Sequence, residues 1–400
     1  MVTIERGGSP RPIDKFITND ENGLNWVKIG DAPEQGNYIT QTAEKIRPEG
    51  LSKTREVHPG DLILSNSMSF GRPYIMAIDG CIHDGWLAIR DTKKNFDLKF
   101  LCTLLGTDGM LNQYKAMAAG STVNNLNKEL VGGTTVAFPM VEEQIKIGDY
   151  FTTLDHLITL HQRKCEQTKK LKKYMLQKMF PRNGAKVPEI RFDGFTYDWE
   201  QRKLGELVKE GILEAPLDGN HGEKHPTSDE YVDSGIPFLM ASDIHNGEVN
   251  IYSCKYITKE RAERLDKGFA RNGDVLLTHK ATIGETAILS NLMTEYAMLT
   301  PQVTYYRIKN EERLNREYLY SFFNSLDFQT ELKTKAAQST RPYIGITAQQ
   351  NLKIILPAEI DEQIRIGLYF RNLDHLITLH QRKCDELKKM KKYMLQNMFI

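Results

Sequence analysis

The stretch that decides the fold is YFTTLDHLITLHQRKCEQTKKLKKYMLQKMF, residues 150–180, because it returns as YFRNLDHLITLHQRKCDELKKMKKYMLQNMF, residues 369–399. The copies are offset by a constant 219 residues (369 − 150), and 24 of their 31 positions are identical. The segments between the copies share no such identity. The chain is therefore an internal duplication in which one part is kept fixed and another is free to differ.

Composition describes a soluble globular chain of 400 residues, 40% hydrophobic and 26% charged, with room for two domains or more. Its apolar runs are too short to cross a membrane and its first residues lack a signal-peptide core, so we expect a cytoplasmic protein. The five cysteines have no CxxC pair, which favours free thiols. Net charge is +1. Residues 143–180 and 362–399 each hold eight basic and four acidic residues, giving +8, so the remainder carries about −7.

Both copies predict a long amphipathic helix, over residues 140–181 and 358–400. Pro139 and Pro357 precede them, acidic residues open them and lysines gather near their ends. An apolar stripe of this length needs a partner, and the nearest matching surface is the other copy. We expect an antiparallel coiled coil, because equivalent units in one chain pack readily about a pseudo-twofold axis. The heptad pattern places these residues in the seam: Leu154, Leu157, His161, Leu171, Met175, Leu373, Leu376, His380, Met390 and Met394.

The seam histidines each have a cysteine four residues later, Cys165 after His161 and Cys384 after His380. Two such pairs could offer four ligands to zinc, but without a CxxC knuckle we expect packing residues and no metal. The lysine runs after each cysteine are typical of a solvated face, with phosphate contact as the alternative.

Short motifs recur in the same order in the two variable segments. Residues 23–31 (GLNWVKIGD) correspond to residues 235–243 (GIPFLMASD). GDLILS at 60–65 corresponds to GDVLLT at 273–278, and AAGST at 118–122 corresponds to AAQST at 336–340. The GD motifs predict a turn followed by a buried strand in a mixed α/β domain. Residues 182–198, rich in Pro, Gly and charge, read as a linker. The sequence contains no GxGxxG, phosphate-loop or HExxH motif, so we expect no catalytic residues.

Together these features resemble the specificity (S) subunits of type I restriction-modification systems, over nearly the whole chain. The resemblance rests on the duplicated helix after its EQxxI entry, the GD and AAxST motifs, and WEQRKLGEL at residues 199–207. It implies an α+β fold with two α/β target recognition domains, here called the first reader (1–139) and second reader (199–357). The conserved helices then space the readers, and each reader recognises one half of a bipartite double-stranded DNA target.

The resemblance also implies a non-catalytic chain without its own cofactor. In the family, two modification subunits carry S-adenosylmethionine and methylate DNA, while restriction subunits use ATP with magnesium to move and cut it. No membrane partner is implied.

Within the readers we expect DNA contacts from polar loops beside Gly or Pro, although turn chemistry explains any single one about as well. Arg72, Lys280 and Arg341 are the stronger candidates, because they can hold guanine edges or phosphates. The candidates of the first reader are Ser65, Asn66, Ser67, Ser69, Arg72, Ser121, Thr122, Asn124 and Asn125. Those of the second reader are Thr278, His279, Lys280, Thr282, Ser339, Thr340, Arg341 and Tyr343.

The first reader departs from the family pattern, because it lacks an equivalent of WEQRKLGEL and is predicted to be short at its N-terminus. Two alternatives to DNA recognition by a non-catalytic subunit stay open. One is a self-contained DNA methylase or nuclease, and the other is a coiled-coil scaffold that binds only protein.

Overall fold

The computed structural model describes residues 2–34, 36–66, 70–118, 125–182, 184–337 and 342–399. Its contacts divide the chain into two compact units: unit 1 is Met1–Lys164 with His380–Ile400, and unit 2 is Cys165–Leu379. Each unit combines one reader with the start of the helix that follows it and the end of the other helix. The expected boundaries followed the repeat in the sequence, whereas packing divides both helices between the units.

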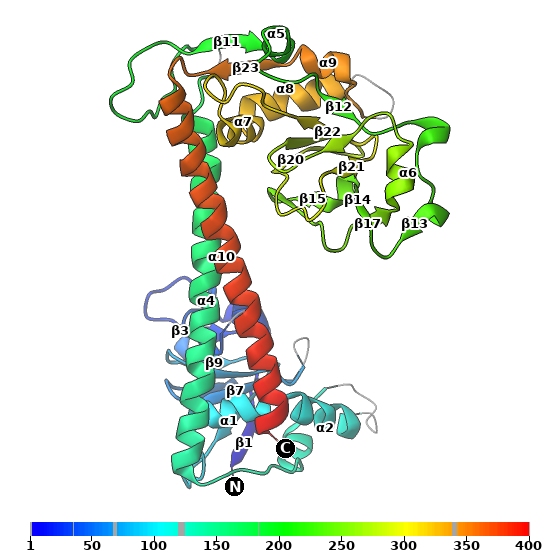
Figure 1. Cartoon of the computed structure of the whole chain (residues 1–400). Helices are drawn as coiled ribbons and strands as arrows, with labels where there is room; N and C mark the ends of the chain where they lie inside the picture. Colours follow the sequence, from blue (N-terminus) through cyan, green and yellow to red (C-terminus); the bar gives the residue numbers. More distant parts are fainter. Residues whose placement is uncertain are drawn as a thin grey trace. The chain divides into compact units, whose positions relative to one another are not determined.

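Two five-stranded sheets form the reader of unit 1 (Figure 1). The first sheet has the order β1 (Thr3–Arg6), β10 (Trp86–Arg90), β7 (Leu62–Ser65), β8 (Pro73–Met76) and β4 (Tyr38–Ile39). The second has the order β2 (Ile17–Thr18), β5 (Glu44–Ile46), β3 (Leu24–Val27), β9 (Gly80–Ile82) and β6 (Arg55–Val57). The helices that follow are α1 (Leu98–Leu105), α2 (Asp108–Ala118) and α3 (Lys128–Gly132). All four residues of β7 are buried, as the GD motif predicts.

The reader of unit 2 contains a four-stranded and a five-stranded sheet. The first has the order β12 (Leu217–Asp218), β22 (Val303–Tyr306), β19 (Val275–Lys280) and β20 (Thr282–Ile288). The second has the order β13 (Tyr231–Val232), β17 (Lys255–Ile257), β14 (Ile236–Leu239), β21 (Ala297–Leu299) and β18 (Phe269–Ala270). Two-stranded sheets are β11 (Glu200–Lys203) with β23 (Lys353–Leu356) and β15 (Ile244–His245) with β16 (Glu248–Val249). The helices are α5 (Leu204–Lys209), α6 (Lys259–Glu263), α7 (Arg316–Phe323), α8 (Leu326–Ala336) and α9 (Ile346–Gln350).

The two readers share most of their topology although their sequences differ, and the first sheet of unit 1 has one additional strand, β4. In the second sheet of each, one central pair is parallel, β3 with β9 and β14 with β21, and the other described pairs are antiparallel. In the first sheet, β10 and β7 of unit 1 correspond to β22 and β19 of unit 2. The duplication seen in the helices therefore extends through both readers.

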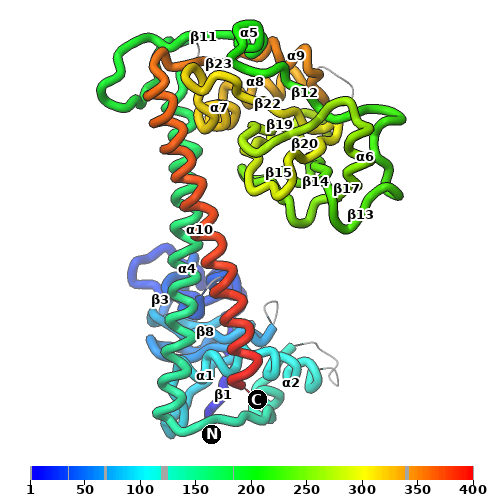
Figure 2. Tube along the Cα trace, viewed as in Figure 1, coloured from blue at the N-terminus to red at the C-terminus, as the bar shows by residue number. Residues whose placement is uncertain are grey.

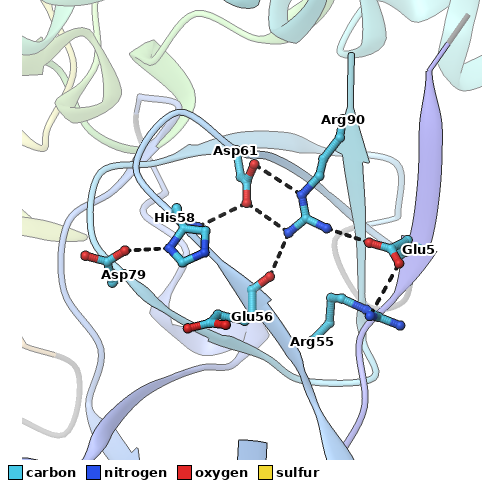
Figure 3. Close-up of polar contacts among 7 residues, drawn as sticks. All are labelled: Glu5, Arg55, Glu56, His58, Asp61, Asp79 and Arg90. Atoms are coloured by element: carbon cyan, nitrogen blue, oxygen red, sulfur yellow. Dashed lines mark hydrogen bonds and ion pairs between the residues drawn. The ribbon is translucent and has the colours of Figure 1, made fainter. Parts of the chain in front are cut away.

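An arginine buttresses the GD turn in each reader, and Figure 3 shows the first case. Arg90 donates from Nη2 to Asp61 Oδ2 at 3.0 Å and to the Glu56 carbonyl at 2.7 Å. Arg307 makes the matching bonds, to Asp274 Oδ2 at 2.7 Å and to the Phe269 carbonyl at 2.8 Å. The aspartate of the GD motif is therefore a framework residue that ties a turn to the end of the neighbouring strand.

The aspartate that ends the first recurring motif also holds a turn. Asp31 Oδ2 accepts the Lys28 N–H at 2.7 Å, and Asp243 Oδ2 accepts the Met240 N–H at 2.8 Å. These carboxylates cap short 3-10 turns, since they satisfy a donor that the turn leaves free. The aspartates of these recurring motifs thus hold equivalent turns in the two readers.

The long helices are α4 (Val141–Lys178) and α10 (Ile360–Met398), which pack together and run antiparallel (Figure 2). In unit 1, Lys391 pairs with Asp155 at 2.5 Å and the Nδ1 atoms of His161 and His380 lie 3.0 Å apart. In unit 2, Lys172 pairs with Asp374 at 2.5 Å. Across these three contacts the residue numbers increase along α4 while those of their partners decrease along α10. The prediction that the helices run antiparallel is therefore confirmed.

The phase of the predicted seam needs correction. Leu154 and Leu373 are buried, whereas Leu171, Leu376 and Met390 are 45%, 41% and 47% exposed. The remaining expected seam residues, Leu157, His161, Met175, His380 and Met394, are partly buried. A neighbouring row of the first helix lies in the core, since Phe151, Ile158, Cys165 and Met179 are buried, and so are Phe370 and Cys384 of the second helix. Leu154 and His161 lie between Phe151, Ile158 and Cys165, so the buried row repeats at alternating spacings of three and four residues. This row is the side of the apolar stripe that faces inward.

Unit 2 has a strand and a helix, β11 and α5, for which the described part of unit 1 holds no counterpart. In unit 2, β11 pairs with β23, and Leu204 and Leu207 of α5 are buried in the core. Among the described helices, none is long and apolar enough to cross a membrane.

Candidate nucleic-acid interface

The hairpin between β19 and β20 ends in an exposed polar tip. Lys280 and Thr282 face each other across Ala281, which has a positive φ of 66°. Tyr343 forms a β-bridge with Lys280 and is 42% exposed. The fold therefore brings three of the predicted DNA-binding residues together, although Tyr343 lies far from the hairpin in the sequence.

Two other predicted residues lie directly beneath this tip and are fully buried. Thr278 Oγ1 accepts the Glu285 N–H at 3.0 Å across the hairpin. His279 donates from Nδ1 to the Ile344 carbonyl at 3.0 Å, and burial lowers its pKa to about 4. The neutral imidazole and the threonine hydroxyl hold the tip in place, and they have no exposed surface to offer a ligand.

An open pocket of about 440 Å³ adjoins Lys280. Its polar lining includes His221, His225, Thr300 and Gln302. Thr300 Oγ1 and His225 Nδ1 are buried atoms without a hydrogen-bond partner among the described residues. The pocket thus places Lys280 beside a polar lining, which suits a phosphate or a base edge.

One wall of this region is fixed by Asp218, which is only 3% exposed. Burial acts to raise the pKa of Asp218, but hydrogen bonds from Lys267 and His221 lower it overall. His221 Nε2 lies 2.8 Å from Asp218 Oδ2, so the carboxylate orients that ring at the pocket edge. The charge of Asp218 is satisfied inside the protein and does not face the pocket unpaired.

The equivalent hairpin of the first reader is built in the same way. Ser65 Oγ accepts the Arg72 N–H at 3.0 Å, which matches the bond of Thr278. Asn66 donates from Nδ2 to the Asp84 carbonyl at 2.9 Å, and both Ser65 and Asn66 are buried. The half-buried Arg72 donates to the Glu34 carbonyl at 2.8 Å, while Asn125 is exposed.

The structure gives no support to the zinc alternative. Within the residues that the structure describes, no three His, Cys, Asp or Glu side chains lie close enough together to hold a metal ion. His161 and His380 meet directly in unit 1, and the pKa of His380 is lowered by burial, by His161 and by Lys164. One ring must accept from the other, so this pair is a hydrogen bond in the seam.

A family model described as "Type I restriction modification DNA specificity domain" matches residues 3–170 and 197–389. The two matched segments each hold one reader and most of its following helix. The chain belongs to this family. Family membership assigns it the DNA-specificity role in a type I restriction-modification system, a non-catalytic one, and confirms the expected fold class.

Named relatives of this specificity chain are similar at low identity. The MjaVIII specificity subunit of Methanocaldococcus jannaschii is 24% identical over 290 residues, covering 70% of this chain and 65% of the relative. The EcoBI specificity subunit of Escherichia coli is 23% identical over 369 residues, covering 88% and 73%. The crystal structure of an S subunit from M. genitalium covers 100% of this chain and 96% of its own, with a TM-score of 0.61 and 13% identity. That likeness shows a shared fold.

Several predicted DNA-binding residues of the specificity chain lie outside the described residues, and their DNA contacts stay predictions. They are Ser67, Ser69, Ser121, Thr122, Asn124, Ser339, Thr340 and Arg341. Sequence reasoning did not single out His221, His225, Thr300 and Gln302 of the pocket. No motif joins them, because two separate loops supply them and only strand pairing brings those loops together.

Proposed function

We propose that the tip formed by Lys280, Thr282 and Tyr343, with the adjoining pocket, contacts one half of a bipartite double-stranded DNA target. The observation that carries the proposal is that exposed donors gather on a hairpin whose framework is repeated in the other reader. A fixed framework with variable exposed tips is what base readout requires, since base contacts specify and phosphate contacts position.

In the first reader we propose the equivalent surface, around Arg72 and Asn125, for the other half-site. Ser65, Asn66, Thr278 and His279 support these surfaces through internal hydrogen bonds, and we assign them no direct base contact. The remaining predicted loop residues keep their proposed role as DNA contacts.

We propose that the helices α4 and α10 set the spacer between half-sites and dock two modification subunits. Their exposed apolar side chains, among them Leu171, Leu376 and Met390, are available for such docking. S-adenosylmethionine would then be bound by the modification subunits, and ATP with magnesium by the restriction subunits. A DNA-modifying assembly of this kind would act in the cytoplasm, where the chromosome lies.

Binding of the assembled modification complex to its DNA target, measured over a range of salt concentrations, tests the DNA proposal. Loss of one lysine–phosphate contact reduces the slope of log K against log salt by about 0.9, whereas loss of a base contact costs about 1–3 kcal/mol at one position. We expect Lys280→Ala to weaken binding through one half-site. Lys259→Ala on α6 is the matched control, an exposed lysine elsewhere in the second reader. Equal binding by wild type and Lys280→Ala would contradict the proposal.

A further inference from the structure

The loop between β9 and β10 of the first reader matches the loop between β21 and β22 of the second, which lines the pocket beside Lys280. In the second reader, the His279 N–H donates to the Gln302 carbonyl at 2.9 Å. In the first, the Asn66 N–H donates to the Gly85 carbonyl at 2.9 Å. Asn66 and His279 stand at the same position after their GD motifs, so the two loops lie at equivalent places beside the hairpins.

The two readers place opposite charges at matched positions around this loop. Arg6 of β1 and Asp218 of β12 pair with matched residues of the neighbouring strand, so they are equivalent. The second reader therefore has its carboxylate on the edge strand, where the first has a guanidinium. In the loop, the first reader has a carboxylate, Asp84, where the second has Pro301. The backbone frame is shared, but the chemical groups that it displays are different.

Asp84 is held in one orientation by its neighbours. His83 Nδ1 accepts the Gly85 N–H at 3.0 Å, so the proton of this ring is on Nε2. That Nε2 lies 2.9 Å from Asp84 Oδ1 and donates to it, and the Ser9 hydroxyl donates to the same oxygen at 3.0 Å. Asn66 donates from Nδ2 to the Asp84 carbonyl at 2.9 Å. Both the side chain and the backbone of Asp84 are thus positioned before any ligand binds.

The second carboxylate oxygen of Asp84 remains available to a ligand. The Asp84 side chain is 33% exposed, and no donor among the described residues bonds to its Oδ2. Beside it, the exposed Arg6 donates from Nε to the Asp84 carbonyl at 3.3 Å, and its terminal nitrogens have no partner in the part of the chain that the structure describes. This surface therefore presents one fixed acceptor next to one cation.

We propose that Asp84 recognises a cytosine in the half-site of the first reader, and that Arg6 contacts a neighbouring phosphate. The inference rests on the proposed function, in which this reader contacts one half of the DNA target. In the major groove, cytosine presents its N4 amino group, which is a donor that a carboxylate can accept. Guanine presents two acceptors, thymine presents O4, and adenine places N7 beside its amino group, so each would bring lone pairs towards the carboxylate.

Methylome sequencing and DNA binding by the assembled modification complex test this inference together. The first half-site is the one that Lys280→Ala leaves unchanged, and we expect it to contain a C·G pair that relaxes in Asp84→Ala. Replacing that pair by T·A should weaken binding of the wild-type complex about tenfold or more, but that of the Asp84→Ala complex less than about twofold. Asp84→Asn, which keeps the shape of the side chain, should admit adenine at that position.

Two further variants separate base recognition from other roles. Arg6→Ala should weaken binding to all sequences alike and reduce the slope of log K against log salt by about 0.9. Asp79→Ala is the matched control, since Asp79 is a 75% exposed carboxylate beside the GD turn, at the other end of the strands (Figure 3). It should leave the motif unchanged. A purely structural Asp84 would weaken binding to both DNAs equally and preserve their ratio.

Three results would overturn the inference: a first half-site without a C·G pair, relaxation at a different base pair, or the wild-type binding ratio in Asp84→Ala. If Lys280→Ala still alters the second half-site, only the role of Asp84 is refuted. If neither Lys280→Ala nor Asp84→Ala changes the motif, the proposed function fails as well.

Discussion

Replacing Arg307 by methionine separates a framework arginine from a DNA-reading one. Arg307 donates from Nε to Asp274 Oδ1 at 2.9 Å and from Nη2 to Oδ2 at 2.7 Å, and Asp274 is 2% exposed. The same guanidinium holds the Phe269 carbonyl. Methionine preserves the apolar stem but leaves a buried carboxylate without its partner.

The expected loss of stability follows from that geometry. Removing one partner of a buried ion pair costs about 3–5 kcal/mol, and the lower end applies because the Arg307 side chain remains 21% exposed. For a domain of this size, about 3 kcal/mol lowers the melting temperature by roughly 6–12 °C. Arg90→Met should have a smaller effect on unit 1, since its partner Asp61 is 18% exposed.

Differential scanning calorimetry of Arg307→Met, Asp274→Asn and the double variant measures this coupling. We expect the double variant to lose less stability than the sum of the two single changes. The double variant removes both charges, so it leaves no buried charge without a partner. A melting temperature unchanged by Arg307→Met, together with lost DNA binding, would refute the framework role and make Arg307 a DNA contact.

Three further predictions concern the core, the seam and the spacer. Because burial lowers the pKa of His279 to about 4, the unfolded chain takes up a proton first, so stability falls by up to about 3 kcal/mol as the pH drops from about 6.5 to 4. His279→Asn, the residue at the matched position Asn66, should flatten that part of a urea-denaturation pH profile. Ile158→Ala should cost about 2–4 kcal/mol and Leu171→Ala less than about 0.5 kcal/mol in the same assay, and equal costs would contradict the observed seam. One heptad added to both helices should lengthen the spacer in the methylated target and leave both half-sites unchanged.

The two long helices could be predicted well from the sequence. The length of the repeat gives the length of each helix, and the matching apolar stripes indicate that the helices pack against each other. The same repeat could not fix which side of the stripe faces inward. Leu171 and Phe151 both continue an apolar row, and only packing against Phe399 and the core of unit 1 shows that the Phe151 row is buried. Heptad counting placed Leu154 and Leu373 correctly in the seam, but it also placed there Leu171, Leu376 and Met390, which are exposed.

The candidate site was predicted in part. The hairpin tip at Lys280 followed from the GD motif, but the burial of Thr278 and His279 depends on strand register, which a sequence leaves open. The recurring aspartates were found as motifs, yet their arginine partners were missed because each lies on another strand. Some of the predicted polar residues therefore stabilise the hairpin through internal hydrogen bonds, whereas others form its exposed tip.

Methylome sequencing of cells that carry the complete system tests the central claim most directly. The experiment compares wild type with Lys280→Ala and Tyr343→Ala. We expect wild type to methylate one bipartite motif, and we expect each variant to relax or lose only the half-site read by the second reader. The first half-site and the spacer should stay the same. Motifs identical to wild type in both variants, or loss at the other half-site alone, would contradict the account.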